Sequence, residues 1–191
     1  MGSGKEGSRE PYSAIIVMKC FTENECSEWL RERAIVEKPY SRNKSEENRD
    51  YYFQFEPPVK TRHLVAFTQN LFLAFGEFPG ALLVFNDWNT YPPNAMAVID
   101  SLRRGHGDLR PLIEAPGHWF AASEQAEAIG HSYLAVTFGW SAYLYLATGK
   151  ATVLFWEGDL VDFWSADRTL VESVGTLIQN YGLRRTGDRG I

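Results

Sequence analysis

Three short apolar and aromatic runs between Tyr143 and Trp164 form the clearest hydrophobic pattern in the chain. The turns that separate them, Gly149-Lys150 and Gly158-Asp159, fit two-residue hairpin loops in which glycine supplies a positive φ. The runs therefore predict an antiparallel β-meander. With two-residue loops, alternation along the strands puts the following side chains on one face: Tyr143, Tyr145, Leu154, Trp156, Val161 and Phe163.

The opposite face of this meander is also apolar, because Leu144, Val153 and Phe155 alternate with the first set. A sheet that is apolar on both sides must be covered on both sides, or must use one side to contact a partner. Burial is the commoner outcome for such runs. We therefore expect the meander to lie inside the protein.

An amphipathic helix is predicted directly after the meander, over residues 166–182. Ser165 is a suitable N-cap residue, and Gly182 ends the pattern. The apolar positions recur at helical spacing and form one stripe: Leu170, Val174, Leu177, Ile178 and Tyr181. The stripe predicts a helix that covers the meander.

Strands and helices alternate along the rest of the chain. Apolar runs predict strands over Ser13–Cys20, Tyr51–Phe55 and Ala81–Phe85. Helices are expected from the capping-box pair Thr22 and Glu25, over residues 60–75, and from Pro93 onward. A further helix begins at Ser123, but Gly130 weakens it, and residues 132–138 fit either a helix or a strand. The polar segment Lys38–Asp50 predicts a loop.

These elements predict an α+β fold in a single compact domain, with a mixed or antiparallel sheet and a C-terminal meander covered by helices. Residues 12–183 are expected to form the domain, between a flexible N-terminus over 1–11 and a flexible tail over 184–191. No internal repeat or interdomain linker interrupts the pattern.

Charge and composition narrow the classes of partner. The 191 residues include 19 Lys plus Arg and 24 Asp plus Glu, a net charge of −5. An acidic chain is poorly suited to neutralising phosphates, so nucleic acid is not expected and a basic partner fits better. No apolar run is long enough to span a membrane, and the first ten residues lack the core of a signal peptide. The sequence thus predicts a cytoplasmic protein.

Neither a cofactor nor a metal is expected from the motifs. Residues 2–7 match a dinucleotide-binding fingerprint by letter, but no strand precedes them. Cys20 and Cys26 have no histidine near them in sequence, which disfavours zinc and favours two reduced thiols.

The candidate catalytic residues are His118 and Glu114, with Asp87 as a second carboxylate. All are predicted in loops, and the turn Glu114-Ala-Pro-Gly-His118-Trp119 could present an imidazole beside an aromatic wall. A loop histidine next to tryptophan is more often packed or hydrogen-bonded than catalytic. The sequence therefore favours no enzyme, and a small hydrolase or transferase remains an alternative.

The candidate binding residues lie in turns beside large aromatic side chains. The loop Asn86–Pro93 offers Asp87, Trp88 and Tyr91. The second meander turn offers Glu157 and Asp159. Aromatic residues in exposed loops supply contact area, although many such loops only cap a core.

A pattern within residues 114–165 resembles the C-terminal part of small bacterial proteins from toxin-immunity neighbourhoods. The matching segments are Gly117-His118-Trp119-Phe120, Ser123-Glu124, Phe138-Gly139-Trp140-Ser141-Ala142-Tyr143-Leu144 and Trp156-Glu157-Gly158-Asp159. The resemblance implies a non-catalytic cytoplasmic protein that neutralises a cognate toxin by direct contact. An acidic surface would complement a basic toxin domain.

Three hypotheses therefore stand in this order: an immunity-like binding protein, a small hydrolase or transferase, and a structural subunit of a phage or secretion assembly. A catalytic site would bring its side chains together in a pocket with perturbed pKa values. A structural subunit would show a large apolar interface.

Overall fold

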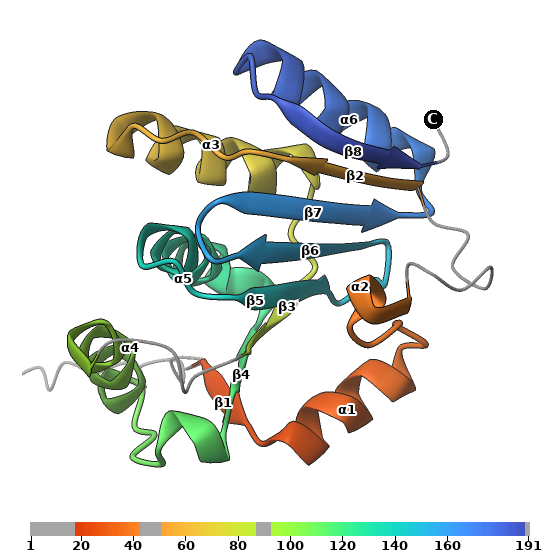
Figure 1. Ribbon diagram of the computed structural model, residues 1–191. Helices are drawn as coiled ribbons and strands as arrows, with labels where there is room; N and C mark the ends of the chain where they lie inside the picture. The colour runs from red at the N-terminus through yellow and green to blue at the C-terminus, as the bar shows by residue number, and fades with distance from the viewer. Residues whose placement is uncertain (1–17, 43–50, 87–92, 190–191) are drawn as a thin grey trace, which may run out of the picture.

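One antiparallel sheet organises the protein, in the strand order β1-β4-β3-β5-β6-β7-β2-β8 (Figure 1). The computed structural model describes residues 18–42, 51–86 and 93–189. The strands are β1 Lys19–Phe21, β2 Tyr51–Phe55, β3 Ala81–Phe85, β4 Gly117–Phe120, β5 Ala142–Leu146, β6 Ala151–Trp156, β7 Leu160–Ser165 and β8 Arg185–Arg189. The helices are α1 Glu23–Glu32, α2 Pro39–Arg42, α3 Thr61–Ala74, α4 Pro93–Gly105, α5 Gln125–Thr137 and α6 Arg168–Asn180. The predicted α+β single domain is confirmed.

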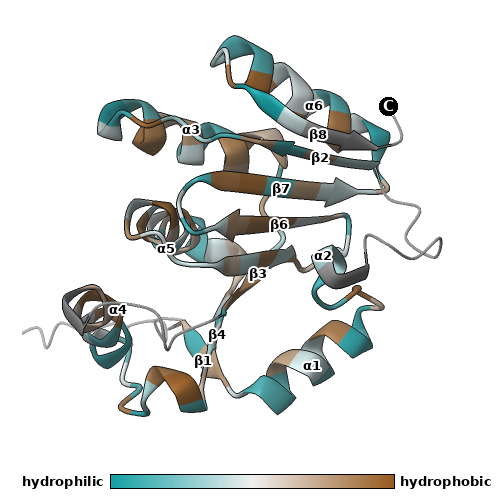
Figure 2. Ribbon diagram, viewed as in Figure 1, coloured by the Kyte–Doolittle hydropathy of each residue, from teal (hydrophilic) through white to brown (hydrophobic). Residues whose placement is uncertain are grey.

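Helices cover both faces of the sheet (Figure 1). On one face, here called the major face, α3, α4, α5 and α6 pack over a large apolar core that includes Phe53, Phe163 and Leu144. On the other, the minor face, α1 packs over an aromatic cluster that includes Tyr143, Tyr145 and Trp164. In Figure 2 the central strands β6 and β7 are coloured mainly as hydrophobic, whereas the edge strand β8 is mainly hydrophilic. No helix in the described part of the chain is long and apolar enough to cross a membrane.

The predicted helix ends follow from local hydrogen bonds. Thr22 and Glu25 form the expected capping box at the start of α1. At α6, the N-cap is Asp167 and not Ser165, because the Asp167 carboxylate accepts from the amides of Thr169 and Leu170. The Ser165 hydroxyl instead donates to the Lys150 carbonyl at 2.6 Å. The apolar stripe of α6 is buried as predicted, with Tyr181 half-buried.

The register of the meander corrects the predicted faces. The first loop has four residues, 147–150, and not two, a difference that leaves the predicted faces of β5 and β6 unchanged. Trp156 pairs with Leu160, so the second loop has three residues and not two. That single extra residue turns the side chains of β7 to the opposite face. Val161 and Phe163 therefore lie on the major face, whereas Asp162 and Trp164 lie on the minor face beside Tyr143.

Several segments with little apolar periodicity adopt regular structure. Residues 117–120, expected to be a turn, form β4 between β1 and β3. Residues 185–189 of the expected flexible tail form β8, which pairs with β2. Residues 39–42 of the expected loop form α2, and residues 132–137 are helical. Of the predicted strand Ser13–Cys20, only its last residues are described, and β1 there is Lys19–Phe21.

Candidate functional site

The acidic turn between β6 and β7 is held firmly against α5. Glu157 and Gly158 have positive φ values of 48° and 79°, as in a type I′ turn, and the Asp159 amide donates to the Trp156 carbonyl at 3.0 Å. A Cβ on Gly158 would lie 2.7 Å from the Val136 carbonyl oxygen. Only glycine allows this approach, so the turn displays Glu157 and Asp159 from a fixed position.

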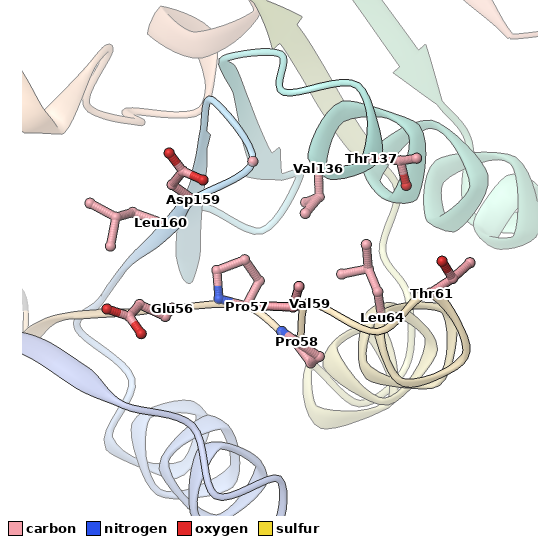
Figure 3. A pocket seen from close by; sticks show the side chains of 11 residues that line it. Glu56, Pro57, Pro58, Val59, Thr61, Leu64, Val136, Thr137, Asp159 and Leu160 are labelled. Carbon is pink, nitrogen blue, oxygen red and sulfur yellow. The ribbon is translucent and has the colours of Figure 1, made fainter.

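A groove of about 560 Å³ opens beside this turn (Figure 3). One wall is the β2–α3 connection, where Pro57 and Pro58 lead to Val59, and the facing wall combines the turn with the last residues of α5. We call it the proline groove. Its lining residues are Glu56, Pro57, Pro58, Val59, Thr61, Leu64, Val136, Thr137, Gly158, Asp159 and Leu160.

The proline groove combines apolar and acidic contacts. Val59 has 98% of its surface exposed, whereas Leu64 and Val136 are buried at the base. Two carboxylates, Glu56 and Asp159, belong to the lining, and none of the described lining residues is basic. Arg184 approaches Glu56 at 3.4 Å, an exposed pair that water screens strongly. The groove therefore suits a ligand that is apolar in part and positively charged in part.

His118 lies in β4 and is fully buried, which differs from the exposed turn expected. Its ring meets Phe85 edge-on at a centroid distance of 5.1 Å. Burial lowers its pKa well below the ordinary value, and His131 and Arg103 lower it further. The Pro116 carbonyl opposes the pKa shift, but it is not aligned for a hydrogen bond to either ring nitrogen. His118 is thus a neutral residue of the core.

The other predicted site residues do not assemble around His118. Glu114 is exposed at the end of a short 3₁₀ helix, and within the described residues no hydrogen bond or ion pair joins it to His118. Asp87, Trp88 and Tyr91 lie outside the described residues. Of the predicted binding residues, Glu157 and Asp159 are both exposed on one turn, and Asp159 lines the proline groove.

A polar cluster surrounds His118 on the major face. The His131 ring of α5 lies 5.6 Å from the His118 ring, and its Nδ1 donates to the Glu127 carbonyl at 2.8 Å. Arg103 of α4 is 1% exposed, and its Nη2 lies 3.6 Å from Asp108 Oδ1. Arg110 Nε donates to both oxygens of Asp108, at 3.2 and 3.1 Å. Arg110 thereby holds the pKa of Asp108 at about 2. We call these five residues the buried polar cluster.

The sequence contained a signal for Arg103 that helical spacing alone could have revealed. The buried positions of α4 are Ala95, Ile99 and Arg103, which follow one another at four-residue intervals. Arg103 thus occupies a core position on an otherwise apolar stripe. The same signal marks His131, which stands at helical spacing between Ala128 and Ala135, both buried in α5.

Asp162 is a second buried charge, on the minor face. One carboxylate oxygen accepts hydrogen bonds from the Tyr52 hydroxyl at 2.6 Å and from Gln54 Nε2 at 2.9 Å. Burial raises the pKa of Asp162, and these two hydrogen bonds oppose the rise. Asp162 lies on the opposite face of the sheet from the buried polar cluster, so the two do not contact each other.

Both cysteines are free and buried, as expected for reduced thiols. Cys20 faces the major core and Cys26 the minor core. Burial raises the pKa of Cys26 to about 12, which disfavours a reactive thiolate. Within the described residues, no group of three or more potential ligands could hold a metal ion.

Comparison of the chain with protein-family models, with curated proteins and with solved structures found no match.

Proposed function

We propose that this chain is a non-catalytic binding protein that holds a segment of a protein partner in the proline groove. The observation that carries the proposal is the convergence of the fixed acidic turn and the exposed Val59 on one groove. Apolar side chains at the centre of an interface supply affinity, whereas rim carboxylates attract a basic partner and orient it.

The expected ligand is an extended segment that carries Lys or Arg next to an apolar residue. The apolar residue would contact Val59 and Leu64, and the cation would lie near Asp159. Pro57 and Pro58 have fixed φ angles, so the wall of the groove loses little conformational entropy on binding.

The more specific proposal is that the partner is a basic toxin domain and that the chain is an immunity protein acting in the cytoplasm. The net charge of −5 supports this form, because opposite charges accelerate association. The buried, neutral state of His118 favours binding over the hydrolase or transferase alternative, since a general base must reach its substrate.

Short immobilised peptides that pair Lys or Arg with an apolar residue are the probe for the groove. Val59→Ser should weaken the binding of these peptides roughly tenfold or more, because the apolar contact is lost. Asp159→Asn should weaken it less, and the loss should shrink at high salt. Leu109→Ser and Glu32→Gln, which alter an exposed apolar and an exposed acidic residue elsewhere, are the matched controls.

Equal binding by wild type, Val59→Ser and Asp159→Asn would reject the groove as the site. For the specific form, the purified product of the adjacent reading frame replaces the peptides in a calorimetric titration. Binding that Val59→Ser weakens, with His118→Phe unchanged, would support it. A measurable turnover abolished by His118→Phe, with intact folding, would instead establish the enzyme alternative.

A further inference from the structure

The guanidinium of Arg103 is an unusual feature of the major core. The side chain is 1% exposed, and none of the described residues accepts a hydrogen bond from its Nε, Nη1 or Nη2. Among the described residues its ion-pair partner is Asp108, at 3.6 Å, a distance longer than a hydrogen bond. Buried cations in proteins are normally paired and hydrogen-bonded, because the loss of hydration is otherwise uncompensated.

Asp108 is shared between two arginines, because it pairs with Arg103 and more closely with Arg110. Arg110 Nε bonds both carboxylate oxygens, and Arg110 Nη2 also donates to the Cys20 carbonyl at 2.8 Å. The two arginines and one aspartate of the buried polar cluster carry one net positive charge, and Arg110, with 41% of its side chain exposed, shares its charge with water. The histidines add none, because burial lowers the pKa of both His118 and His131.

The neighbouring polar atoms are also unpartnered among the described residues. They are both ring nitrogens of His118, the Nε2 of His131 and the hydroxyl of Ser132. His118 and Ser132 are fully buried, and His131 is 3% exposed. Arg103 is close enough to His118 to lower its pKa, and the His131 ring lies 5.6 Å from the His118 ring. Unpartnered groups beside a buried cation indicate a site that binds a polar ligand and not a packing defect.

We propose that Arg103, with His118 beside it, forms a binding site for a small oxyanion, a phosphate or a carboxylate group. A guanidinium presents parallel N–H donors that match the oxygens of either group. Neutral His118 adds one N–H donor, whereas the N–H of His131 is already bonded to the Glu127 carbonyl. We place the entrance for the ligand at the corner after α4, because Asp108 keeps 13% of its side chain exposed there and Arg110 keeps 41%.

Thermal unfolding with added inorganic phosphate, acetate or chloride is the first test. Phosphate or acetate, or both, should raise the melting temperature of the wild type more than chloride at equal ionic strength. The variant Arg103→Met, which keeps the bulk of the side chain without its charge, should lose this difference. Arg104→Gln is the matched control, because Arg104 is the exposed neighbour on the same helix and should leave the shift intact. The general stabilisation by excluded salts would raise all three proteins alike.

Calorimetric titration gives the size of the effect. Loss of charge-assisted hydrogen bonds in Arg103→Met should weaken binding of the effective anion roughly tenfold to hundredfold. The ratio of the affinities for phosphate and acetate identifies the preferred anion. Equal affinities of wild type and Arg103→Met would overturn the proposal.

A measurement on the unaltered protein covers the case in which Arg103→Met does not fold. Titration of the wild type with the same anions, followed by NMR, should shift the Arg103 Nε resonance and the imidazole signals of His118 and His131. The exposed His63 of α3 should not move with them. Unchanged Arg103 and His118 signals at saturating anion would show that the cluster holds no oxyanion, and the proposal would be wrong.

Discussion

The two ends of the major face of the sheet differ sharply in chemistry. At the β7–β2 end, Phe53 and Phe163 stack at 4.9 Å, and Phe55 meets Phe67 of α3 edge-on at 5.8 Å. At the β4–β1 end, the helices cover the buried polar cluster instead. Both ends lie under helices, so burial beneath a helix does not by itself explain the difference in chemistry.

The aromatic end is suited to stabilising the fold, whereas the polar end is suited to binding. Each buried phenylalanine at the first end removes apolar surface from water and stabilises the fold. The buried nitrogens at the second end have no hydrogen-bond partner among the described residues, and burial without a partner costs stability. A polar cluster that the fold retains at such a cost is expected to serve binding. The predictions below test whether the two ends contribute as differently as this comparison requires.

Phe163→Ala should have the largest effect on stability. Phe163 is fully buried and stacks on Phe53, so its truncation should lower the free energy of unfolding by about 3–5 kcal/mol. Urea denaturation, with Arg168→Ala as an exposed control on α6, measures the loss. A loss below that of a typical surface substitution would contradict the proposed role of the aromatic end.

Leu177→Ala should come next. Leu177 is 8% exposed on the apolar stripe of α6 and lies at the rim of the α3–α6 interface. We expect a loss near the lower end of the range for buried leucine, about 2–3 kcal/mol. The same denaturation series measures it, and an unchanged midpoint would place Leu177 outside the core.

His118→Phe should have the smallest effect near neutral pH. Phenylalanine has a similar size and removes two unpartnered nitrogens, so the change in the free energy of unfolding should stay within about 1.5 kcal/mol of zero. A loss as large as that of Phe163→Ala would show that the polar end stabilises the fold as strongly as the aromatic end. The two ends would then not differ in their contribution to stability.

The same variant also tests the pH dependence of the polar end. Burial lowers the pKa of His118 and His131 in the folded state, whereas the unfolded chain takes up protons near pH ~6.5. Stability should therefore fall as the pH drops below that value, by at most about 1.4 kcal/mol per pH unit for each histidine. His118→Phe should reduce the slope of stability against pH by about half, since His131 remains.

Asp162 contributes to the pH dependence with the opposite sign. Its pKa is raised on folding, so the folded state binds the proton first and gains stability as the pH falls through that pKa. Asp162 is present in both proteins, so the difference between wild type and His118→Phe isolates the histidine. Identical pH profiles for the two proteins would show that His118 is not neutral in the fold.

The local pattern of the sequence determined most of the elements. Helical spacing identified α1, α3, α4 and α6, and apolar runs identified β2, β3 and the meander. These features depend on interactions within a few residues, namely capping hydrogen bonds and a periodic apolar face. The two residues of the acidic turn, Glu157 and Asp159, were identified for the same reason, because turn chemistry is local.

Only the tertiary structure decided the strands β4 and β8. Residues 117–120 and 185–189 form strands because their backbones pair with distant neighbours, β1 and β3 in one case and β2 in the other. Their side chains carry little apolar alternation of their own. Pairing between segments far apart in sequence is a property of the whole sheet, and no local pattern encodes it.

The tertiary structure also decided the sites. One extra loop residue set the faces of β7, and β4 carried His118 from an expected turn into the core. The proline groove joins residues near 57, 136 and 159, and the buried polar cluster joins residues from 103 to 131. The sequence supplied the residue types, but their distances from one another follow from chain packing, which a one-dimensional pattern does not contain.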